Sequence, residues 1–235
     1  MDYSIVIPFY NEEDNVFELL DELVKTLHDA SLDAEIIAVD DGSTDQTLKS
    51  LQDVKTRFPS VRIICMEKRS GQSAALWAGI QNARGTVIIT MDGDRQNDPS
   101  DIPRMTALMK DHDAVFGWRK NRKDPLGKRL SSCLANGIRT LFLGKDVHDT
   151  GCGLKVMKKE FLEDIFPFNG MHRFFPSLLR MKKARFTECA VNHRQRQKGK
   201  TKYSALNRVF TAFCDLLAVK WMQKKRLQYS IKEIR

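Results

Sequence analysis

The feature that most constrains the fold is an alternation of short β-branched runs with longer helical patterns through the first half of the chain. Short runs in which apolar and polar residues alternate, or in which all residues are apolar, predict strands at 4–8, 35–40, 61–66, 86–91 and 113–117. Helical periodicity falls between them, at 12–28, 45–57, 71–83 and 101–110. Strict alternation implies right-handed crossovers, so we expect an α/β fold with a mostly parallel sheet flanked by helices.

Four polar segments directly follow predicted strands. They read PFYNEEDN, DDGSTD, DGDRQNDP and GWRKNR. Because ligands of parallel α/β sheets bind at the carboxyl ends of the strands, these segments should meet at one edge and form a ligand site. The sequence has neither a G-x-G-x-x-G loop nor a Walker lysine motif, which argues against an ordinary dinucleotide-binding or P-loop domain.

The segment TMDGDRQNDP, at 90–99, carries two carboxylates one residue apart. If the chain stays extended there, Asp92, Asp94 and Gln96 point to the same face. Two carboxylates and an amide oxygen suit a hard divalent cation such as Mg²⁺ or Mn²⁺. The pattern by itself is also compatible with a turn capped by aspartates and helped by Gly93 and Pro99.

The cysteines and the N-terminus bear on the compartment. Five cysteines, an odd number without metal-ligand spacing, favour free thiols in a reducing compartment and argue against a zinc site. The N-terminal MDYSIVIPFYNEE has an early acid and no basic region, so it does not resemble a signal peptide. No run reaches the ~18 apolar residues that span a bilayer. We expect a soluble or peripheral protein.

Positive charge is concentrated at the C-terminal end. The segment 193–235 holds twelve lysines and arginines against two acids, whereas the chain as a whole carries a net charge of +9. Such a segment favours an anionic partner, either membrane phosphates, a phosphorylated substrate or nucleic acid, although a solvated basic surface is the alternative. The chain shows no recognisable RNA- or DNA-binding module, and we do not expect a nucleic-acid partner.

Residues 206–226 combine this charge with an amphipathic helical pattern. One stripe gathers apolar side chains, and three basic residues at 224–226 follow it. An interfacial helix on anionic lipid and a helix packed on the protein's own core are both compatible with this pattern. The stripe consists of Leu206, Val209, Phe210, Phe213, Leu216, Leu217 and Trp221.

Several motifs together resemble family 2 glycosyltransferases of the Rossmann-like GT-A fold, and within them the dolichyl-phosphate mannose synthase group of polyprenyl-phosphate glycosyltransferases. The motifs are IPFYNEEDN, AVDDGSTDQT, GQSAALWAGIQNARGTVIITMDGDRQNDP, HDTGCGLK and VNHRQRQKGKTKY. The resemblance implies a catalytic domain at 1–204, followed by an amphipathic basic helix at 205–235. It also implies inverting, Mg²⁺- or Mn²⁺-dependent transfer of a hexose from a UDP- or GDP-sugar to a polyprenyl phosphate. The enzyme would be cytoplasmic and peripheral on the cytoplasmic membrane face.

The same resemblance implies a donor site. Asp40 would bind the base, Glu12 would lie near the ribose, and the metal would be held by Asp92, Asp94 and Gln96. Arg69 departs from the family, in which many members have Asn. The implied nucleotide-binding residues are Pro8, Tyr10, Glu12, Asp40, Asp41, Gly71, Gln72 and Asp92.

The acceptor and the diphosphate complete the implied site. A lipid phosphate, with a second pKa of ~6, needs cations rather than a strong base; with a hydroxyl acceptor on a glycan or lipid headgroup, Asp149 would be the general base. Lys155 and Cys152 stand where the mannose synthases have Arg and Ser, which leaves the sugar open. The implied catalytic residues are Asp94, Asp149 and Arg119; the acceptor residues are Arg119, Lys128, Arg129 and Ser132; the basic diphosphate loop contributes Arg194, Arg196, Lys200 and Lys202. A non-enzymatic nucleic-acid-binding protein is the distant alternative.

Overall fold

The computed structural model describes residues 1–120, 137, 139–144, 147–195 and 211–226, and the backbone of 205–210. The strands are β1 (Tyr3–Phe9), β2 (Ala34–Asp40), β3 (Val61–Cys65), β4 (Val87–Thr90), β5 (Ala114–Trp118), β6 (Lys155–Lys158) and β7 (Phe186–Ala190). The helices are α1 (Val16–Asp29), α2 (Thr47–Arg57), α3 (Gln72–Gln81), α4 (Ile102–Ala107), α6 (Phe175–Met181) and α7 (Ala205–Lys225), with 3-10 turns η1 (Pro99–Asp101), η2 (Leu108–Lys110), η3 (Lys159–Phe161) and η4 (Met171–Arg173).

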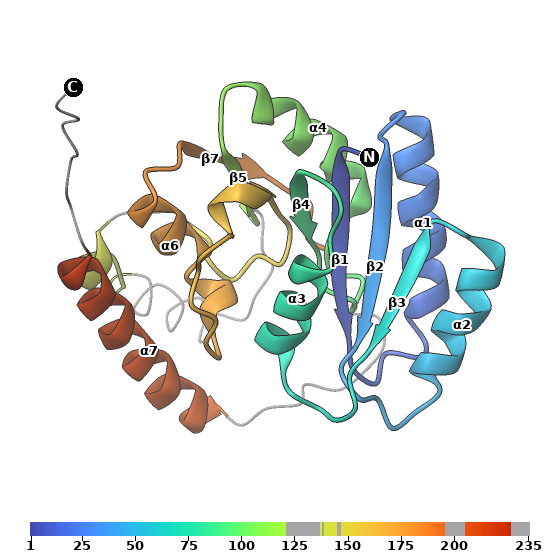
Figure 1. Ribbon diagram of the computed structural model, residues 1–235, viewed down its shortest axis with the longest axis horizontal. Coiled ribbons are helices and arrows are strands. Elements are labelled where there is room, and N and C mark those ends of the chain that lie inside the picture. The colour runs from blue at the N-terminus through green and yellow to red at the C-terminus, as the bar shows by residue number, and fades with distance from the viewer. Residues whose placement is uncertain (121–136, 138, 145–146, 196–204, 227–235) are drawn as a thin grey trace, which may run out of the picture.

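The described strands form one sheet in the order β3-β2-β1-β4-β6-β5-β7. Every neighbouring pair is parallel except the two that involve β6, which runs antiparallel between β4 and β5. The mostly parallel α/β sheet predicted from the sequence is confirmed, and each of the five predicted strands is present with ends shifted by a few residues. Figure 1 shows β1, β2 and β3 side by side at one end of this sheet.

Two strands, β6 and β7, were not predicted from the sequence. The sequence of β6 is KVMK and that of β7 is FTECA, and neither contains a β-branched run. Their neighbours supply the reason for the extended conformation, since β6 pairs with strands on both sides and β7 completes the edge beside β5. Tertiary pairing overrides weak local propensity here.

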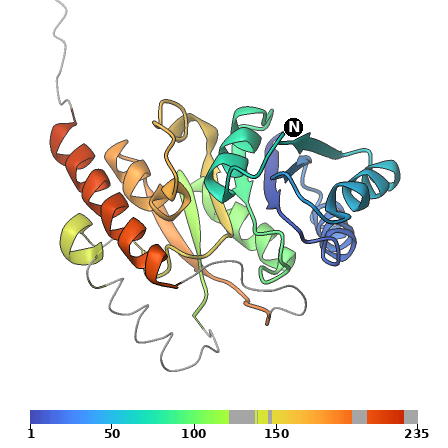
Figure 2. The ribbon, with the colours of Figure 1, turned by 90° about the horizontal axis from the view of Figure 1, so that it is seen from below.

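Helices cover both faces of the sheet and bury two apolar clusters. Along β1 the side chains alternate, so that Ile5 and Ile7 join the cluster with α1 and α2, whereas Val6 joins the cluster with α3, α6 and α7. Figures 1 and 2 both show α7 alongside α6, at the opposite end of the molecule from α1 and α2. Both faces of the sheet are therefore buried.

The C-terminal helix α7 has two different sides. Leu216 and Val219 are buried in the second cluster, so part of this helix packs on the protein's own core. Phe213, Leu217 and Trp221, four residues apart, are 44%, 44% and 62% exposed. Among the described residues, no helix combines the length and the apolar character needed to cross a bilayer.

Candidate functional site

The polar segments meet at the carboxyl edge of the sheet, as the alternation predicted. Asp40 ends β2, Asp92 follows β4 and Arg119 follows β5. The Gln72 side chain, at the start of α3, donates a hydrogen bond to Asp92 Oδ1 over 2.8 Å. The charge of Arg119 in turn acts on Asp92. Residues from three strand ends and one helix start therefore share one site.

The paired aspartates lie in a turn rather than in an extended segment. Arg95 has φ +61° and Asp94 Oδ1 accepts the Gln96 N–H over 3.2 Å, so the chain is not extended there and the turn considered as the alternative is present. Asp94 still lies near enough for its charge to act on Asp92, and burial together with this charge raises the pKa of Asp92 to about 6. A Cβ on Gly153 would collide with the Asp92 carboxylate, so a side chain there would displace that carboxylate.

This arrangement fits a divalent cation that shares its ligands with a substrate. Two like charges in a partly buried site favour either a proton or a metal ion. Within the described ranges no group of three His, Cys, Asp or Glu side chains could hold a metal. A cation at Asp92 and Asp94 would therefore complete its shell with other oxygens, as Mg²⁺ commonly does with phosphates.

At the expected nucleotide site, the adjacent Asp40 and Asp41 make different contacts. Asp41 accepts hydrogen bonds from the Ser70 N–H over 2.7 Å and from the Gly71 N–H over 2.9 Å, which fixes the loop before α3. The Oδ2 atom of Asp40 accepts the Ser43 N–H over 3.3 Å. The Oδ1 atom of Asp40 is buried and has no hydrogen-bond partner in the described part of the chain. A buried acceptor of this kind is suited to a donor on a ligand.

The other residues expected at the nucleotide surround this edge. Pro8 lies near the end of β1, and the Arg69 guanidinium lies 4.3 Å from the Tyr10 ring centroid. Glu12 is buried, and its carboxylate accepts the Asn15 side-chain amide over 2.7 Å. Aromatic, cationic and carboxylate groups are thus present together beside Asp40.

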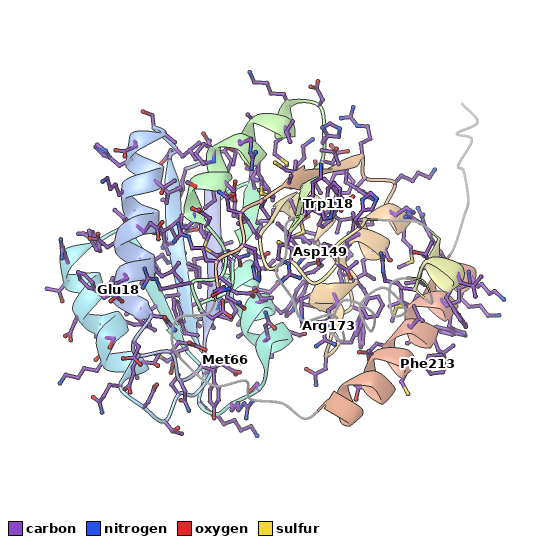
Figure 3. The ribbon with its side chains drawn as sticks, turned by 180° about the vertical axis from the view of Figure 1, so that it is seen from behind. Glu18, Met66, Trp118, Asp149, Arg173 and Phe213 are labelled. Carbon is purple, nitrogen blue, oxygen red and sulfur yellow. The ribbon has the colours of Figure 1, made fainter. Side chains whose placement is uncertain are left out.

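On the expected acceptor side, Arg119 and Asp149 form a bidentate ion pair. Arg119 Nε lies 2.7 Å from Asp149 Oδ2 and Arg119 Nη2 lies 2.9 Å from Asp149 Oδ1, with both side chains mostly buried. Figure 3 shows Asp149 near the middle of the molecule, with Trp118 above it and Arg173 below it. Both Asp149 oxygens are engaged, so accepting a proton would disrupt the pair.

The basic loop is described only at its start. Arg194 lies 2.5 and 2.8 Å from Glu22 and 2.8 Å from Asp98, so reaching a diphosphate would require its guanidinium to leave both carboxylates. The remaining expected residues of this loop and of the acceptor site lie outside the described residues. They are Arg196, Lys200, Lys202, Lys128, Arg129 and Ser132.

A cavity of about 670 Å³ lies next to Asp92. Its wall includes Lys155, which the sequence analysis noted, and Ser73, His172, Arg173 and Asp215, which it did not assign to a site. Ser73 Oγ and His172 Nδ1 are 2.7 Å apart, and burial lowers the pKa of His172 to about 3, so the imidazole is neutral. The spacing of these cavity residues along the chain gave no signal, because they come from four separate segments.

Comparison with known proteins agrees with this geometry. The profile described as "Glycosyl transferase family 2" matches residues 4–166, well over half of the chain. The chain belongs to this family. A family 2 glycosyltransferase is an enzyme, which confirms the class expected from the motifs.

Curated relatives of this glycosyltransferase act on polyprenyl phosphates. Dodecaprenyl-phosphate galacturonate synthase of Rhizobium johnstonii is 37% identical over 95% of this chain and 68% of its own length. Undecaprenyl-phosphate 4-deoxy-4-formamido-L-arabinose transferase of Proteus mirabilis is 33% identical over 91% of this chain and 66% of its own. The chain thus spans about two thirds of the length of these relatives. The corresponding transferase of Pseudomonas fluorescens (strain SBW25) is 35% identical, and the chain spans 63% of its length.

Solved structures share the fold at low identity. Glucosyl-3-phosphoglycerate synthase from Mycobacterium tuberculosis, in complex with Mn²⁺ and UDP-glucose, gives a TM-score of 0.68 at 18% identity and covers 94% of this chain and 78% of its own. S. aureus TarS 1-349 in complex with UDP-GlcNAc gives 0.67 at 18%, over 94% of this chain and 67% of its own. The expected GT-A architecture of the family 2 enzyme is confirmed.

Proposed function

We propose that this chain transfers a sugar from a nucleotide sugar to a polyprenyl phosphate at a membrane surface, with inversion at the anomeric carbon. The observation that carries the proposal is the carboxylate pair Asp92 and Asp94, at the same carboxyl edge of the sheet as the unsatisfied Asp40 oxygen. Relatives named for polyprenyl-phosphate transfer support the acceptor, and fold neighbours solved with UDP-sugars and Mn²⁺ support the donor and the metal.

Asp92 and Asp94 would hold a Mg²⁺ or Mn²⁺ ion against the donor diphosphate, with Gln96 nearby. When bound, the ion offsets the negative charge that develops on the leaving nucleoside diphosphate. Asp40 accepts an N–H of the base through its Oδ1 atom, and Tyr10 and Glu12 lie beside it. Gln72 orients Asp92 from the start of α3, so the carboxylate is positioned before substrate arrives.

The Arg119–Asp149 pair favours a phosphate acceptor over a hydroxyl acceptor. A phosphate monoester, with a second pKa of ~6, already carries a nucleophilic oxygen at neutral pH and requires no general base. Asp149 is engaged on both oxygens by Arg119, so its role is to hold the guanidinium at the acceptor side. A direct attack on the sugar by this oxygen inverts the anomeric centre.

The exposed side of α7 would lie on the bilayer. Phe213, Leu217 and Trp221 present an apolar stripe, and Leu141, which is 82% exposed, extends it beside the Phe142–Phe213 ring contact at 6.3 Å. The exposed basic residues at 224–226 end the helix and would meet anionic headgroups. A protein held in this way brings its cytoplasmic-face active site to a lipid acceptor.

Purified protein incubated with UDP- and GDP-sugars, Mn²⁺ and undecaprenyl phosphate tests the reaction. We expect a lipid-linked sugar that forms only when the lipid carries its phosphate, and that is lost with Asp94→Asn. Transfer to undecaprenol, to a glycan hydroxyl or to a headgroup would contradict the acceptor assignment. Such a reaction should need Asp149 as a general base, and its rate should fall at low pH as that base is protonated.

Vesicle flotation tests the membrane face. Replacing Phe213, Leu217 and Trp221 together by Ser should reduce binding to vesicles containing phosphatidylglycerol by roughly tenfold or more, because each buried apolar side chain contributes about 1.5–3 kcal/mol. A matched control replaces three exposed polar or charged residues on the distant helices α1 and α2, Glu18, Asp53 and Lys55, by Ser. Unchanged flotation of the apolar variant would exclude this face.

A further inference from the structure

The order of the strands fixes where Lys155 lies along the site. The carboxyl edge presents Asp40 on β2, Asp92 after β4, Lys155 at the start of β6 and Arg119 after β5, with β1 between the first two. Neighbouring strands are about 4.8 Å apart, so Asp40 and Asp92 are separated by about 10 Å and Lys155 is one strand further. A donor with its base at Asp40 and its diphosphate at Asp92 therefore brings its sugar to Lys155.

Lys155 is a buried cation on the wall of the cavity. It is only 4% exposed, and it lines the cavity of about 670 Å³ together with Thr90 and Gly153. Its ammonium donates a hydrogen bond to the Cys152 carbonyl, its one hydrogen bond within the described residues. An ammonium has three donors, and burial lowers the pKa of Lys155. A buried charge with so few partners is costly unless a ligand supplies an anion.

The anions near Lys155 are engaged elsewhere. Both oxygens of Asp149 bind Arg119. In the proposed reaction the charge of Asp92 is shared with Asp94 and a divalent ion. Burial raises the pKa of the Cys152 thiol to about 11, so this thiol is neutral and supplies no negative charge. The Lys155 ammonium therefore has no carboxylate hydrogen-bonded to it among the described residues, and two of its three donors are left for a ligand.

We propose that Lys155 determines donor specificity by binding a carboxylate on the transferred sugar, so that the cavity selects a hexuronic acid over the corresponding neutral hexose. This inference rests on the proposed function and adds the chemical class of its donor. Arg173 lines the same cavity and offsets the charge of Asp215 from α7, which reduces the repulsion between this carboxylate and an acidic sugar. Neutral His172, held by Ser73, can face a sugar hydroxyl.

A matched donor pair tests the inference on the full chain. UDP-galacturonate and UDP-galactose differ only in a carboxylate against a hydroxymethyl group, and kcat/KM is measured for each with Mn²⁺ and undecaprenyl phosphate. We expect wild type to prefer the acidic donor by about 10- to 100-fold, the range of one charge-assisted hydrogen bond. Lys155→Met should lower kcat/KM for the acidic donor by about 10- to 100-fold more than for the neutral donor, and Lys155→Arg should retain the preference. Lys110→Met, at an exposed lysine, is the control.

Calorimetry without acceptor gives a readout besides turnover. UDP-galacturonate should bind Lys155→Met more weakly than wild type, whereas UDP alone should bind both equally. Equal losses for both donors and for UDP would assign Lys155 to the diphosphate and overturn the inference. So would a wild-type preference for the neutral donor. A protein that transfers no sugar from any nucleotide donor contradicts the proposed function itself, whereas transfer of neutral sugars alone contradicts only the specificity.

Discussion

The two edges of the sheet hold their charges in opposite ways. At the amino edge, Glu35 accepts hydrogen bonds from Ser4 and the Arg84 N–H and pairs with Arg62; although burial opposes it, these contacts lower its pKa. At the carboxyl edge, burial and Asp94 raise the pKa of Asp92 to about 6. The protein satisfies Glu35 with its own groups at one edge and leaves Asp92 and the Asp40 Oδ1 atom for ligands at the other, which is the usual difference between structural and functional ionisable groups.

The largest effect should come from Asp92→Asn. Losing the carboxylate that holds the cation should lower kcat by about 10²- to 10³-fold, as for one lost electrostatic contact to a developing charge. The metal-free variant should be at least as stable as wild type at pH 7.5, because an ionised Asp92 with a raised pKa destabilises the fold there. Turnover measured with titrated Mn²⁺ checks the loss of kcat, and thermal melting of the metal-free proteins checks the stability. Asp53→Asn, at an exposed residue, is the control; a less stable Asp92→Asn would place Asp92 with the amino-edge charges.

Glu35→Ala should show the reverse separation of effects. It leaves Ser4, the Arg84 N–H and the Arg62 guanidinium without their shared acceptor, and we expect urea unfolding to show a loss of about 3 kcal/mol. The kcat/KM of the folded variant should stay within about twofold of wild type, because Glu35 lies at the far end of β2 from Asp40. Glu18→Ala, at an exposed residue of α1 (Figure 3), should cost less than 1 kcal/mol. A large loss of activity in the folded Glu35→Ala variant would mean that the charges at the amino edge are not purely structural.

The amino-terminal half was predictable from sequence because its signals are local. β-branched runs gave β1 to β5, and strand ends gave Asp40, Asp92 and Arg119. The second half depends on tertiary pairing: β6 is extended because β4 and β5 flank it, and Lys155 becomes a site residue only through that pairing. The α7 pattern predicted an apolar stripe but could not divide it into a core side and an exposed side.

A smaller effect is expected from Asp40→Asn. The variant keeps an oxygen for the Ser43 N–H but removes the charge at the unsatisfied Oδ1 position. Losing one charge-assisted hydrogen bond should weaken UDP or GDP binding by about 10- to 100-fold without lowering thermal stability. Asp41→Asn should instead destabilise the protein, because the Asp41 carboxylate holds Ser70 and Gly71. Calorimetry and melting curves separate the two; equal nucleotide affinity for Asp40→Asn and wild type would remove Asp40 from the base site.

The smallest effect, and the one that compares the edges most directly, is their response to acid. Lys158 and Arg185, against the opposing effect of burial, lower the pKa of Asp113 to about 2. A lowered pKa gives stability that is present above the ordinary value near 3.8 and is lost as pH falls towards 2. Since Arg185 is exposed, we expect a loss of only about 1 kcal/mol.

The raised pKa of Asp92 has the opposite effect on stability. In the metal-free protein the ionised carboxylate destabilises the fold, and this destabilisation disappears as Asp92 is protonated between its raised pKa of about 6 and the ordinary value of 3.8. In urea unfolding, Asp92→Asn and wild type should therefore converge as pH falls from 7 to 4, whereas Asp113→Asn and wild type should converge only below 4. Convergence of both pairs in one pH range would mean that the two edges hold their carboxylates alike.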